Sequence, residues 1–183
     1  RRASKIPYTY KTAQEKRTAL LAAMESWIKG MMENVGNKVN KWDVINEPIT
    51  DGTNQWRGIE GNFMDDDKAP VEQDGLTLNW ADGHFYWGYY IGKDYAVKAF
   101  EYARKYSPVT AELYVNDYNL ETSPSKLAAL IAFVKYIEDN GQKVDGIGTQ
   151  MHVSSTITKD QVDAMFTTLA ATGKKIRVSE LDV

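Results

Sequence analysis

The sequence predicts an α/β fold in which four parallel strands alternate with helices. Short runs rich in β-branched and aromatic residues occupy residues 42–46, 113–116, 144–150 and 176–181, and each has the length of a strand. Helical patterns lie between these runs, and the last three runs begin roughly 30 residues apart, as in βαβ units. Because a complete (β/α)8 barrel needs at least about 200 residues, four strands in 183 residues indicate an open doubly wound sheet or half of a barrel.

The first predicted helix covers residues 12–36, where Thr12 and Glu15 have the spacing of a capping box. Apolar residues recur along it at helical spacing, and we expect this face to be buried. The stripe consists of Leu20, Met24, Trp27, Met31 and Val35. The second predicted helix covers residues 94–106 and stops before Pro108.

Two further helices follow the second and third strands. Ser123 is placed to cap the first of them and Pro124 to fill its first position, and the helical pattern ends at Gly141. The other begins at Thr158, which has Gln161 three residues on, and it ends near residue 173.

Residues 49–90 form a long insert after the first strand and show no clear period. Structureless loops longer than roughly 12–15 residues are uncommon in compact domains, and the many aromatic residues here disfavour disorder. We therefore expect a folded excursion over the carboxyl ends of the strands, with an aromatic cluster of its own. The aromatic residues are Trp56, Phe63, Trp80, Phe85, Tyr86, Trp87, Tyr89 and Tyr90.

Composition excludes several classes of protein. Lys and Arg number 22 against 25 Asp and Glu, so a net charge of −3 gives no support for nucleic-acid binding. No apolar stretch approaches the roughly 18 residues of a membrane span, so membrane insertion is not expected. The absence of cysteine rules out thiolate catalysis and cysteine-bound zinc. The chain begins at Arg1, which suggests removal of an upstream segment or a piece of a longer protein.

Polar and ionisable groups follow all four predicted strands. The strands end in Asn46-Glu47, Asn116-Asp117-Tyr118-Asn119, Gln150-Met151-His152 and Ser179-Glu180-Leu181-Asp182. Catalytic groups collect at this edge of parallel α/β sheets, and a curved sheet would bring Glu47 and Glu180 together. Two facing carboxyl groups suit glycoside hydrolysis, in which one protonates the leaving oxygen while the other attacks the sugar carbon.

Four segments carry a resemblance to a known family. The segments WDVINEP, LYVNDYNLE, VDGIGTQMH and IRVSELDV occur in the order typical of glycoside hydrolase family 10, the retaining endo-β-1,4-xylanases. The Asn-Glu-Pro motif alone recurs in a whole clan of barrel glycosidases, but four segments in order are specific. The resemblance implies a (β/α)8 TIM barrel whose fourth to seventh strands lie in this chain, so that residues 1–183 form a partial catalytic barrel domain.

The resemblance also implies roles for individual residues. Glu47 would be the general acid/base and Glu180 the nucleophile, at the roughly 5–5.5 Å carboxyl separation of retaining enzymes. Supporting residues would hold the reacting sugar or position Glu180; they are Asn46, His152 and Asp182. Substrate-binding residues would line the subsites on either side of the bond; they are Gln150, Tyr118, Asn116 and Asn119. Tyr118 would stack under the first sugar on the leaving-group side.

Two departures from the family accompany the resemblance. The insert after Pro48 is longer than usual, and no segment matches the strands that build the subsites for the non-reducing side of the sugar chain. The expected partners are therefore xylan or xylo-oligosaccharides and the missing barrel strands, with no metal or organic cofactor. Because xylan cannot enter a cell, a secreted, periplasmic or cell-surface location is expected. The alternatives are another barrel glycosidase, such as a β-glucanase or mannanase, or a non-catalytic glycan-binding fragment.

Overall fold

The computed structural model describes residues 12–59, 71–73, 76–78 and 85–183. Four strands form one sheet in the order β1-β4-β5-β6, and every neighbouring pair is parallel. The strands are β1 (Lys41–Asn46), β4 (Glu112–Asp117), β5 (Gly146–Thr149) and β6 (Lys175–Val178). The predicted parallel α/β fold is confirmed, and the strand order is that of consecutive strands in a barrel.

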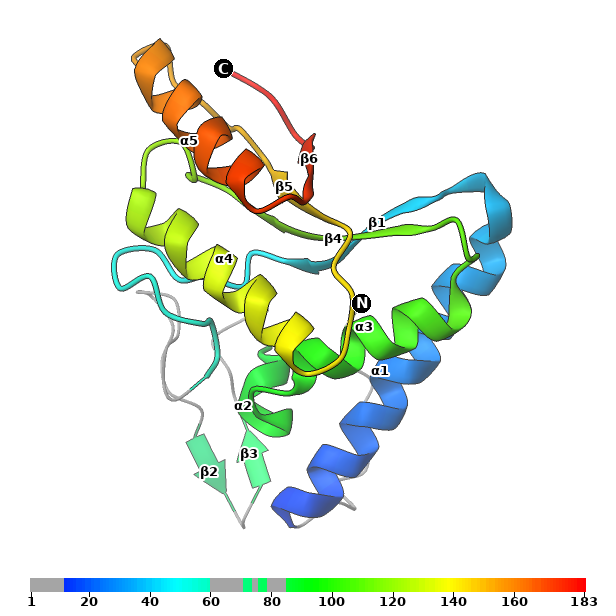
Figure 1. The fold of residues 1–183 in the computed structure, drawn as a ribbon. Coiled ribbons are helices and arrows are strands. Elements are labelled where there is room, and N and C mark those ends of the chain that lie inside the picture. Colours follow the sequence, from blue (N-terminus) through cyan, green and yellow to red (C-terminus); the bar gives the residue numbers. More distant parts are fainter. Residues whose placement is uncertain (1–11, 60–70, 74–75, 79–84) are drawn as a thin grey trace.

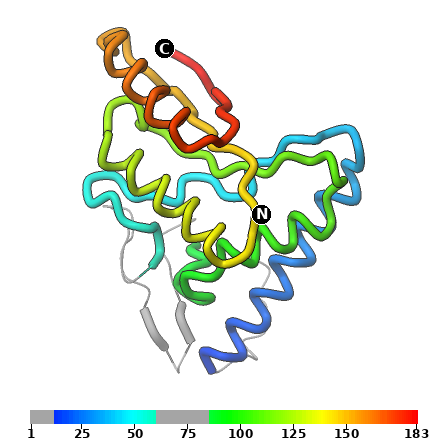
Figure 2. Tube along the Cα trace, in the orientation of Figure 1, coloured from blue at the N-terminus to red at the C-terminus, as the bar shows by residue number. Residues whose placement is uncertain are grey.

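Each return from one strand to the next passes through a helix, as Figure 2 shows along the chain trace. These helices are α3 (Tyr95–Tyr106), α4 (Pro124–Asp139) and α5 (Lys159–Ala171), and α1 (Ala13–Val35) precedes the first strand. Figure 1 shows α1, α3 and α4 together beneath β1 and β4, with α5 beside β5 and β6. The short helix η1 (Gly36–Lys38) joins α1 to β1.

Local capping explains where the helices begin. Thr12 and Glu15 form the predicted capping box on α1, and Thr158 forms the equivalent box with Gln161 on α5. The Ser123 side chain accepts a hydrogen bond from the Lys126 amide at the start of α4. The strands were predicted less accurately, since β5 covers only residues 146–149 of the predicted 144–150, and β6 covers residues 175–178 instead of the predicted 176–181.

The hydrophobic core lies between one face of the sheet and the helices. Successive strand residues point to opposite faces, so Leu113 and Val115 of β4 and Ile147 of β5 enter this core. All three are fully buried. The helices contribute the other side of the core, with Phe100, Leu130, Phe133, Ile137, Met165 and Leu169.

One prediction for α1 is wrong. Met24 is buried, but Trp27 is 69% exposed and Met31 is 41% exposed, whereas Met32 is buried. Helical spacing marks an apolar stripe but does not say which part of it meets a neighbouring element. Here α1 packs on α3, whereas Trp27 lines a hollow next to the edge strand β1.

The insert is folded where the structure describes it. The strands β2 (Val71–Gln73) and β3 (Leu76–Leu78) pair antiparallel, and the helix α2 (Trp87–Ile91) contacts α1 and α3. The expected aromatic cluster is present, because the Phe85 ring lies 5.0 Å from that of Trp87 and 5.4 Å from that of Tyr90. Trp56 packs instead against Phe133 and Tyr136 of α4, while Phe63 and Trp80 lie outside the described residues.

The sheet is curved, so that its first and last strands approach each other on the face opposite the helices. Arg177 on β6 lies 3.3 Å from Asp43 on β1, although β4 and β5 separate these strands. At the start of the strands, Glu112 of β4 forms an ion pair with Lys175 of β6. The curvature has the sense that barrel closure requires.

Burial falls from the centre of the sheet to its edges. Residues of β5 are all buried, whereas β1 and β6 are mostly exposed or half-buried. Within the described part of the chain, the outer sides of β1 and β6 pair with no further strand. Unpaired strand edges are templates for association with other chains.

We therefore expect residues 1–183, expressed alone, to associate and to lack sharp tertiary packing at the sheet edges. Analytical ultracentrifugation and near-UV circular dichroism would measure both properties. A longer polypeptide that supplies further barrel strands is the control and should be monomeric with sharp aromatic signals. A well-packed monomer of residues 1–183 would contradict this prediction.

Candidate active site

Glu47 directly follows β1 in a strained backbone conformation. Its φ is 53°, in the left-handed region that non-glycine residues rarely adopt. Such a conformation costs on the order of 1–3 kcal/mol and persists only where the surroundings hold it. The Glu47 amide donates to the carbonyl of Asn116 at 2.8 Å, which ties this residue to the end of β4.

Glu180 lies at the opposite edge of the sheet, just after β6. Its amide donates to the carbonyl of Gln150 at 3.1 Å, so the chain continues the parallel register for two residues beyond the strand. Its side chain is 43% exposed, and its Oε1 accepts a 2.9 Å hydrogen bond from Asn116. The sheet thus presents the two glutamates at the carboxyl ends of its two outer strands.

A chain of neutral amides connects the two carboxylates. Nε2 of Gln150 donates to Oε1 of Glu47 at 3.1 Å and to Oδ1 of Asn46 at 3.3 Å. Nδ2 of Asn116 donates to the same Asn46 oxygen at 2.9 Å and to Glu180. Asn46 of β1, Asn116 of β4 and Gln150 directly after β5 therefore join Glu47 and Glu180 through shared hydrogen bonds.

Two of these amides are deeply buried. Asn116 is 1% exposed and Gln150 is 2% exposed. The oxygen of Asn116 accepts from the hydroxyl of Ser179 at 2.8 Å, so both ends of this amide are bonded inside the protein. The geometry shows these residues orienting the glutamates, while their assignment to substrate binding stays a prediction.

Missing side chains on β5 make room for the Asn116 amide. A Cβ at Gly148 would lie 2.3 Å from Oδ1 of Asn116, and one at Gly146 would lie 2.1 Å from the ring of Tyr114. Neither distance is physically possible without movement. The two glycines of the VDGIGTQMH segment therefore let β4 side chains lie across β5.

His152 and Asp182 form a pair beside Glu180, and their role in positioning it stays a prediction. Nδ1 of His152 is 2.9 Å from Asp182, and Nε2 is 3.5 Å from Glu180. The hydrogen bond to Asp182 raises the pKa of His152, and the charge of Glu180 adds to this effect. The residue between Gln150 and His152 is Met151, whose φ of 58° turns the chain between these two side chains.

Tyr118 and Asn119 occupy different surroundings. The Tyr118 hydroxyl donates to Asp51 at 2.5 Å, in the loop that follows Glu47. Asn119 instead lines a shallow hollow with His152, Ser154 and Gln161. The structure thus brings Tyr118 to the Glu47 loop and places Asn119 on the His152 side.

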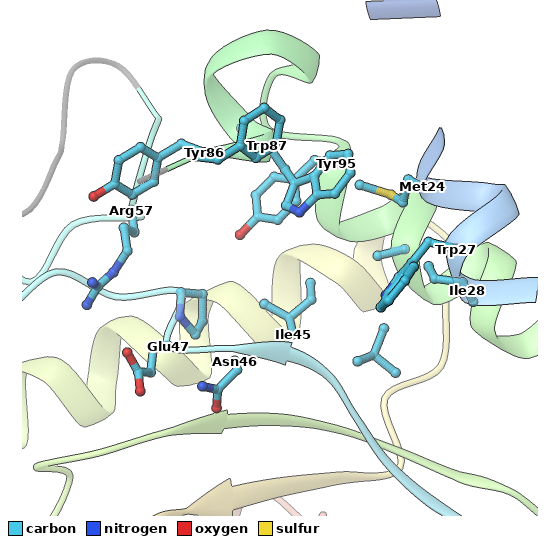
Figure 3. Close-up of a pocket in the computed structure, with 15 residues that line it drawn as sticks. Met24, Trp27, Ile28, Ile45, Asn46, Glu47, Arg57, Tyr86, Trp87 and Tyr95 are labelled. Atoms are coloured by element: carbon cyan, nitrogen blue, oxygen red, sulfur yellow. The ribbon is translucent and has the colours of Figure 1, made fainter. Parts of the chain in front are cut away.

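A hollow of about 350 Å³ runs along β1 next to Glu47. Figure 3 shows Asn46, Glu47 and Arg57 at its polar end, and Met24, Trp27 and Ile28 of α1 at its apolar end. Tyr86, which precedes α2, Trp87 of α2 and Tyr95 of α3 close it on the other side. The insert thus supplies part of the wall beside Glu47.

Several residues of the site were not anticipated. Ser179 was recognised only as part of a polar strand end, although its position before Glu180 was a usable signal. Gly146 and Gly148 also carried a signal, since glycine within a strand marks a close approach. Nothing in the sequence around Asp51 and Lys126 indicated that these residues pair with each other.

Two features are absent from the part of the chain that the structure describes. There, no helix combines the length and apolar character that a bilayer crossing requires. Histidine, aspartate and glutamate side chains also form no group of three that could bind a metal ion in this part.

Comparison with known proteins gives consistent matches. The model of glycosyl hydrolase family 10 matches residues 3–183. The endo-1,4-beta-xylanase C of Paenibacillus barcinonensis is 33% identical over 168 residues, which are 91% of this chain and 14% of that protein. The chain thus spans a small part of this relative.

Two solved structures show the same fold. A family 10 structure from Paenibacillus barcinonensis aligns with a TM-score of 0.72 at 31% identity and covers 91% of this chain and 43% of that one. A mutant of the intracellular xylanase of Thermoanaerobacterium saccharolyticum, solved with xylotriose, aligns with a TM-score of 0.69 at 30% identity. It covers 91% of this chain and 44% of that one, so the chain spans less than half of each structure.

We expect Gly148→Ala to displace the Asn116 side chain and so to disrupt the link between Glu47 and Glu180. Overpacking of this kind costs about 1–3 kcal/mol of stability, and any glycosidase turnover should fall with it. Urea unfolding and a crystal structure of the variant would measure the two effects. Gly30→Ala is the matched control, because a Cβ there meets nothing within 4 Å. An unmoved Asn116 would contradict the prediction.

We expect Asp182→Asn to lower the pKa of His152 towards its ordinary value of 6.5. Because the folded-state pKa is raised, the pair stabilises the protein below pH 6.5 and loses this effect as the pH rises through the folded-state value. The variant should therefore lose more stability at about pH 5 than at about pH 8.

Histidine NMR titration would test this shift, with the His152 signal assigned by its absence from a His152→Gln variant. Asp163→Asn is the control, because Asp163 pairs with Lys159 on α5 and not with a histidine. An unchanged pKa of His152 in Asp182→Asn would show that a group other than Asp182 raises it.

Proposed function

The chain belongs to glycosyl hydrolase family 10, and on this basis we propose that its parent protein is a retaining endo-β-1,4-xylanase. The observation that supports this most directly is the amide chain that joins Glu47 to Glu180 across the sheet. It holds two carboxylates at the carboxyl edge of parallel strands, where barrel enzymes place their chemistry.

In the proposed mechanism, Glu180 attacks the anomeric carbon of xylan and forms a covalent glycosyl-enzyme. Glu47 gives its proton to the leaving oxygen and then takes one from the water that hydrolyses the intermediate. Asn116 and His152 fix the orientation of the attacking carboxylate. Gln150 does the same for Glu47, and Asn46 receives both amides at a point between the glutamates.

The exposed surfaces of the site fit a polymeric substrate. Asn46 and Glu180 are exposed, whereas the amides that position the glutamates are buried behind them. Tyr118 and the loop after Glu47 lie on the side where the acid would protonate the leaving group. We assign Tyr118 to the first sugar on that side.

The substrate is tested by comparing reducing-sugar release from xylan, β-glucan and mannan by the parent polypeptide. Faster release from xylan supports the proposal. Preference for glucan or mannan would indicate another barrel glycosidase, and binding without turnover would indicate a glycan-binding protein.

We further propose a secreted, periplasmic or cell-surface location, because the xylan polymer cannot enter a cell. Fractionation of the producing cells would test this. Recovery inside the cells would contradict it; the xylanase of Thermoanaerobacterium saccharolyticum is described as intracellular.

We expect Glu180→Ala and Glu47→Ala to differ on activated aryl xylobiosides in the parent polypeptide. Without the nucleophile, Glu180→Ala should turn over no glycoside. Glu47→Ala should lose roughly 10²–10⁴-fold on xylan but should still release one equivalent of a phenol that needs no protonation. It should then stall at the glycosyl-enzyme, because no base activates water.

Stopped-flow measurement of phenol release separates the two variants. Glu33→Ala on α1 is the control, since Glu33 is exposed and pairs only loosely with Lys29 at 3.8 Å. Equal loss for both variants on the activated substrate would contradict the assignment of acid/base and nucleophile.

A further inference from the structure

A buried lysine on α4 takes no part in the amide chain between the glutamates. Lys126 is only 1% exposed, yet it carries an ammonium group. Its Nζ lies 2.8 Å from Oδ1 of Asp51 and 3.1 Å from Oδ1 of Asp117. A buried charge is tolerated only when it is paired and hydrogen-bonded, and these two carboxylates meet that need.

The same ammonium group lies against an aromatic ring of the candidate site. Nζ of Lys126 is 3.5 Å from the centroid of the Tyr118 ring, which is close for a cation–π contact. Asp51 accepts hydrogen bonds from Lys126 through Oδ1 and from the Tyr118 hydroxyl through Oδ2. The ring of Tyr118 is thus held at one face and at its hydroxyl.

These contacts join two loops of the carboxyl edge. Asp51 belongs to the loop after Glu47, and Tyr118 follows β4, whose Asn116 contacts Glu180. Asp117 adds a further link, because its Oδ2 accepts a 3.2 Å hydrogen bond from the amide of Ile49. The ion pair between Lys126 and Asp51 therefore links the Tyr118 ring to the loop that follows Glu47, and the Arg57 side chain adds a further hydrogen bond to Tyr118.

The protonation states of Tyr118 and Asp51 keep the hydrogen bond between them intact near neutral pH. Burial and the hydrogen bond to Asp51 raise the pKa of Tyr118 to about 12, so its hydroxyl remains a donor. Partial burial opposes ionisation of Asp51, but hydrogen bonds from Lys126 and Tyr118 outweigh it and lower the pKa of this carboxyl. Asp51 therefore remains the acceptor.

We propose that Lys126 and Asp51 are positioning residues that hold Tyr118 as a platform for the sugar on the leaving-group side. The proposal rests on the proposed glycosidase function. The ammonium lies over one face of the ring, so the sugar would stack on the opposite face, and the ion pair would hold the ring in place for it. The pair thereby determines how well the enzyme uses leaving groups that are sugars.

A purely structural role for Lys126 makes a different prediction. If the lysine only neutralises buried Asp117, its loss lowers stability and affects all substrates alike. If it positions Tyr118, its loss affects substrates according to whether their leaving group reaches the ring.

The experiment compares two substrates in the parent polypeptide. Xylotetraose has a sugar as its leaving group, whereas the fluoride of β-xylobiosyl fluoride is too small to reach Tyr118. For Lys126→Met and Asp51→Asn, we expect the ratio of kcat/KM on xylotetraose to kcat/KM on the fluoride to fall about tenfold, as for the loss of one charge-assisted hydrogen bond. Lys135→Met is the matched control on α4, since Lys135 is exposed and pairs with Asp139, and its ratio should be unchanged.

Transfer of the xylobiosyl group to added xylose gives a second measurement, because the acceptor binds where the leaving sugar left. Transfer relative to hydrolysis should fall in the same two variants. If Lys126→Met does not fold, Asp51→Asn carries the test, since the Asp51 side chain is 43% exposed and asparagine has the same shape.

An unchanged substrate ratio and an unchanged transfer ratio in folded Asp51→Asn would overturn the positioning role. Equal losses on both substrates would overturn it as well. A wild-type protein that releases no fluoride from β-xylobiosyl fluoride would contradict the proposed function instead, so the two failures are distinct.

Discussion

The arrangement of the site depends on the space that two glycines leave on one face of β5. Gly146 and Gly148 have no side chains, and so Tyr114 and Asn116 from β4 lie across the strand. Only in this position does Asn116 reach Asn46 on one side and Glu180 on the other. A methyl group at Gly148 would occupy the place of the amide oxygen that accepts from Ser179. The hydrogen bonds through Asn116 that connect the two outer strands therefore require a residue without a side chain at Gly148.

Backbone strain is concentrated at the same edge of the sheet. Glu47 and Met151 both have positive φ, and they directly follow Asn46 and Gln150 of the amide chain. The Glu47 amide is held by Asn116, and the Gln150 amide donates to the carbonyl of Asp117 at 2.9 Å. Such conformations cost free energy, and the ladder hydrogen bonds of the central strands hold them in place. The Glu47 and Gln150 side chains meet at this edge, where Nε2 of Gln150 donates to Oε1 of Glu47.

Much of the fold could be predicted because its signals are local. Caps at Thr12, Ser123 and Thr158 obey rules that involve four neighbouring residues, and all three helices begin there. The exposure of Trp27 could not be predicted, because it depends on which element packs against α1. The burial of Lys126 could not be predicted either, because lysine in a helix is usually exposed to solvent. One of its partners, Asp51, also lies far from it in the sequence. Local patterns thus located the two glutamates, whereas the contacts that orient their surroundings arise only in the folded sheet.

The two glutamates lie on the less protected strands, and their buried partners lie on the protected ones. β4 and β5 are covered by helices and supply Asn116 and Gln150, whereas β1 and β6 carry Glu47 and Glu180 at the exposed edges. Packing at the edges therefore cannot fix the distance between the carboxylates within the described residues. What fixes it is a series of four hydrogen bonds between 2.9 and 3.3 Å that runs from Glu47 through Gln150, Asn46 and Asn116 to Glu180. Each amide nitrogen donates to Asn46 and to one glutamate, so Asn46 is the shared acceptor of the two amides. The central strands thus set the geometry of groups that the outer strands carry, and an enzyme that needs two carboxylates at a fixed separation requires this coupling.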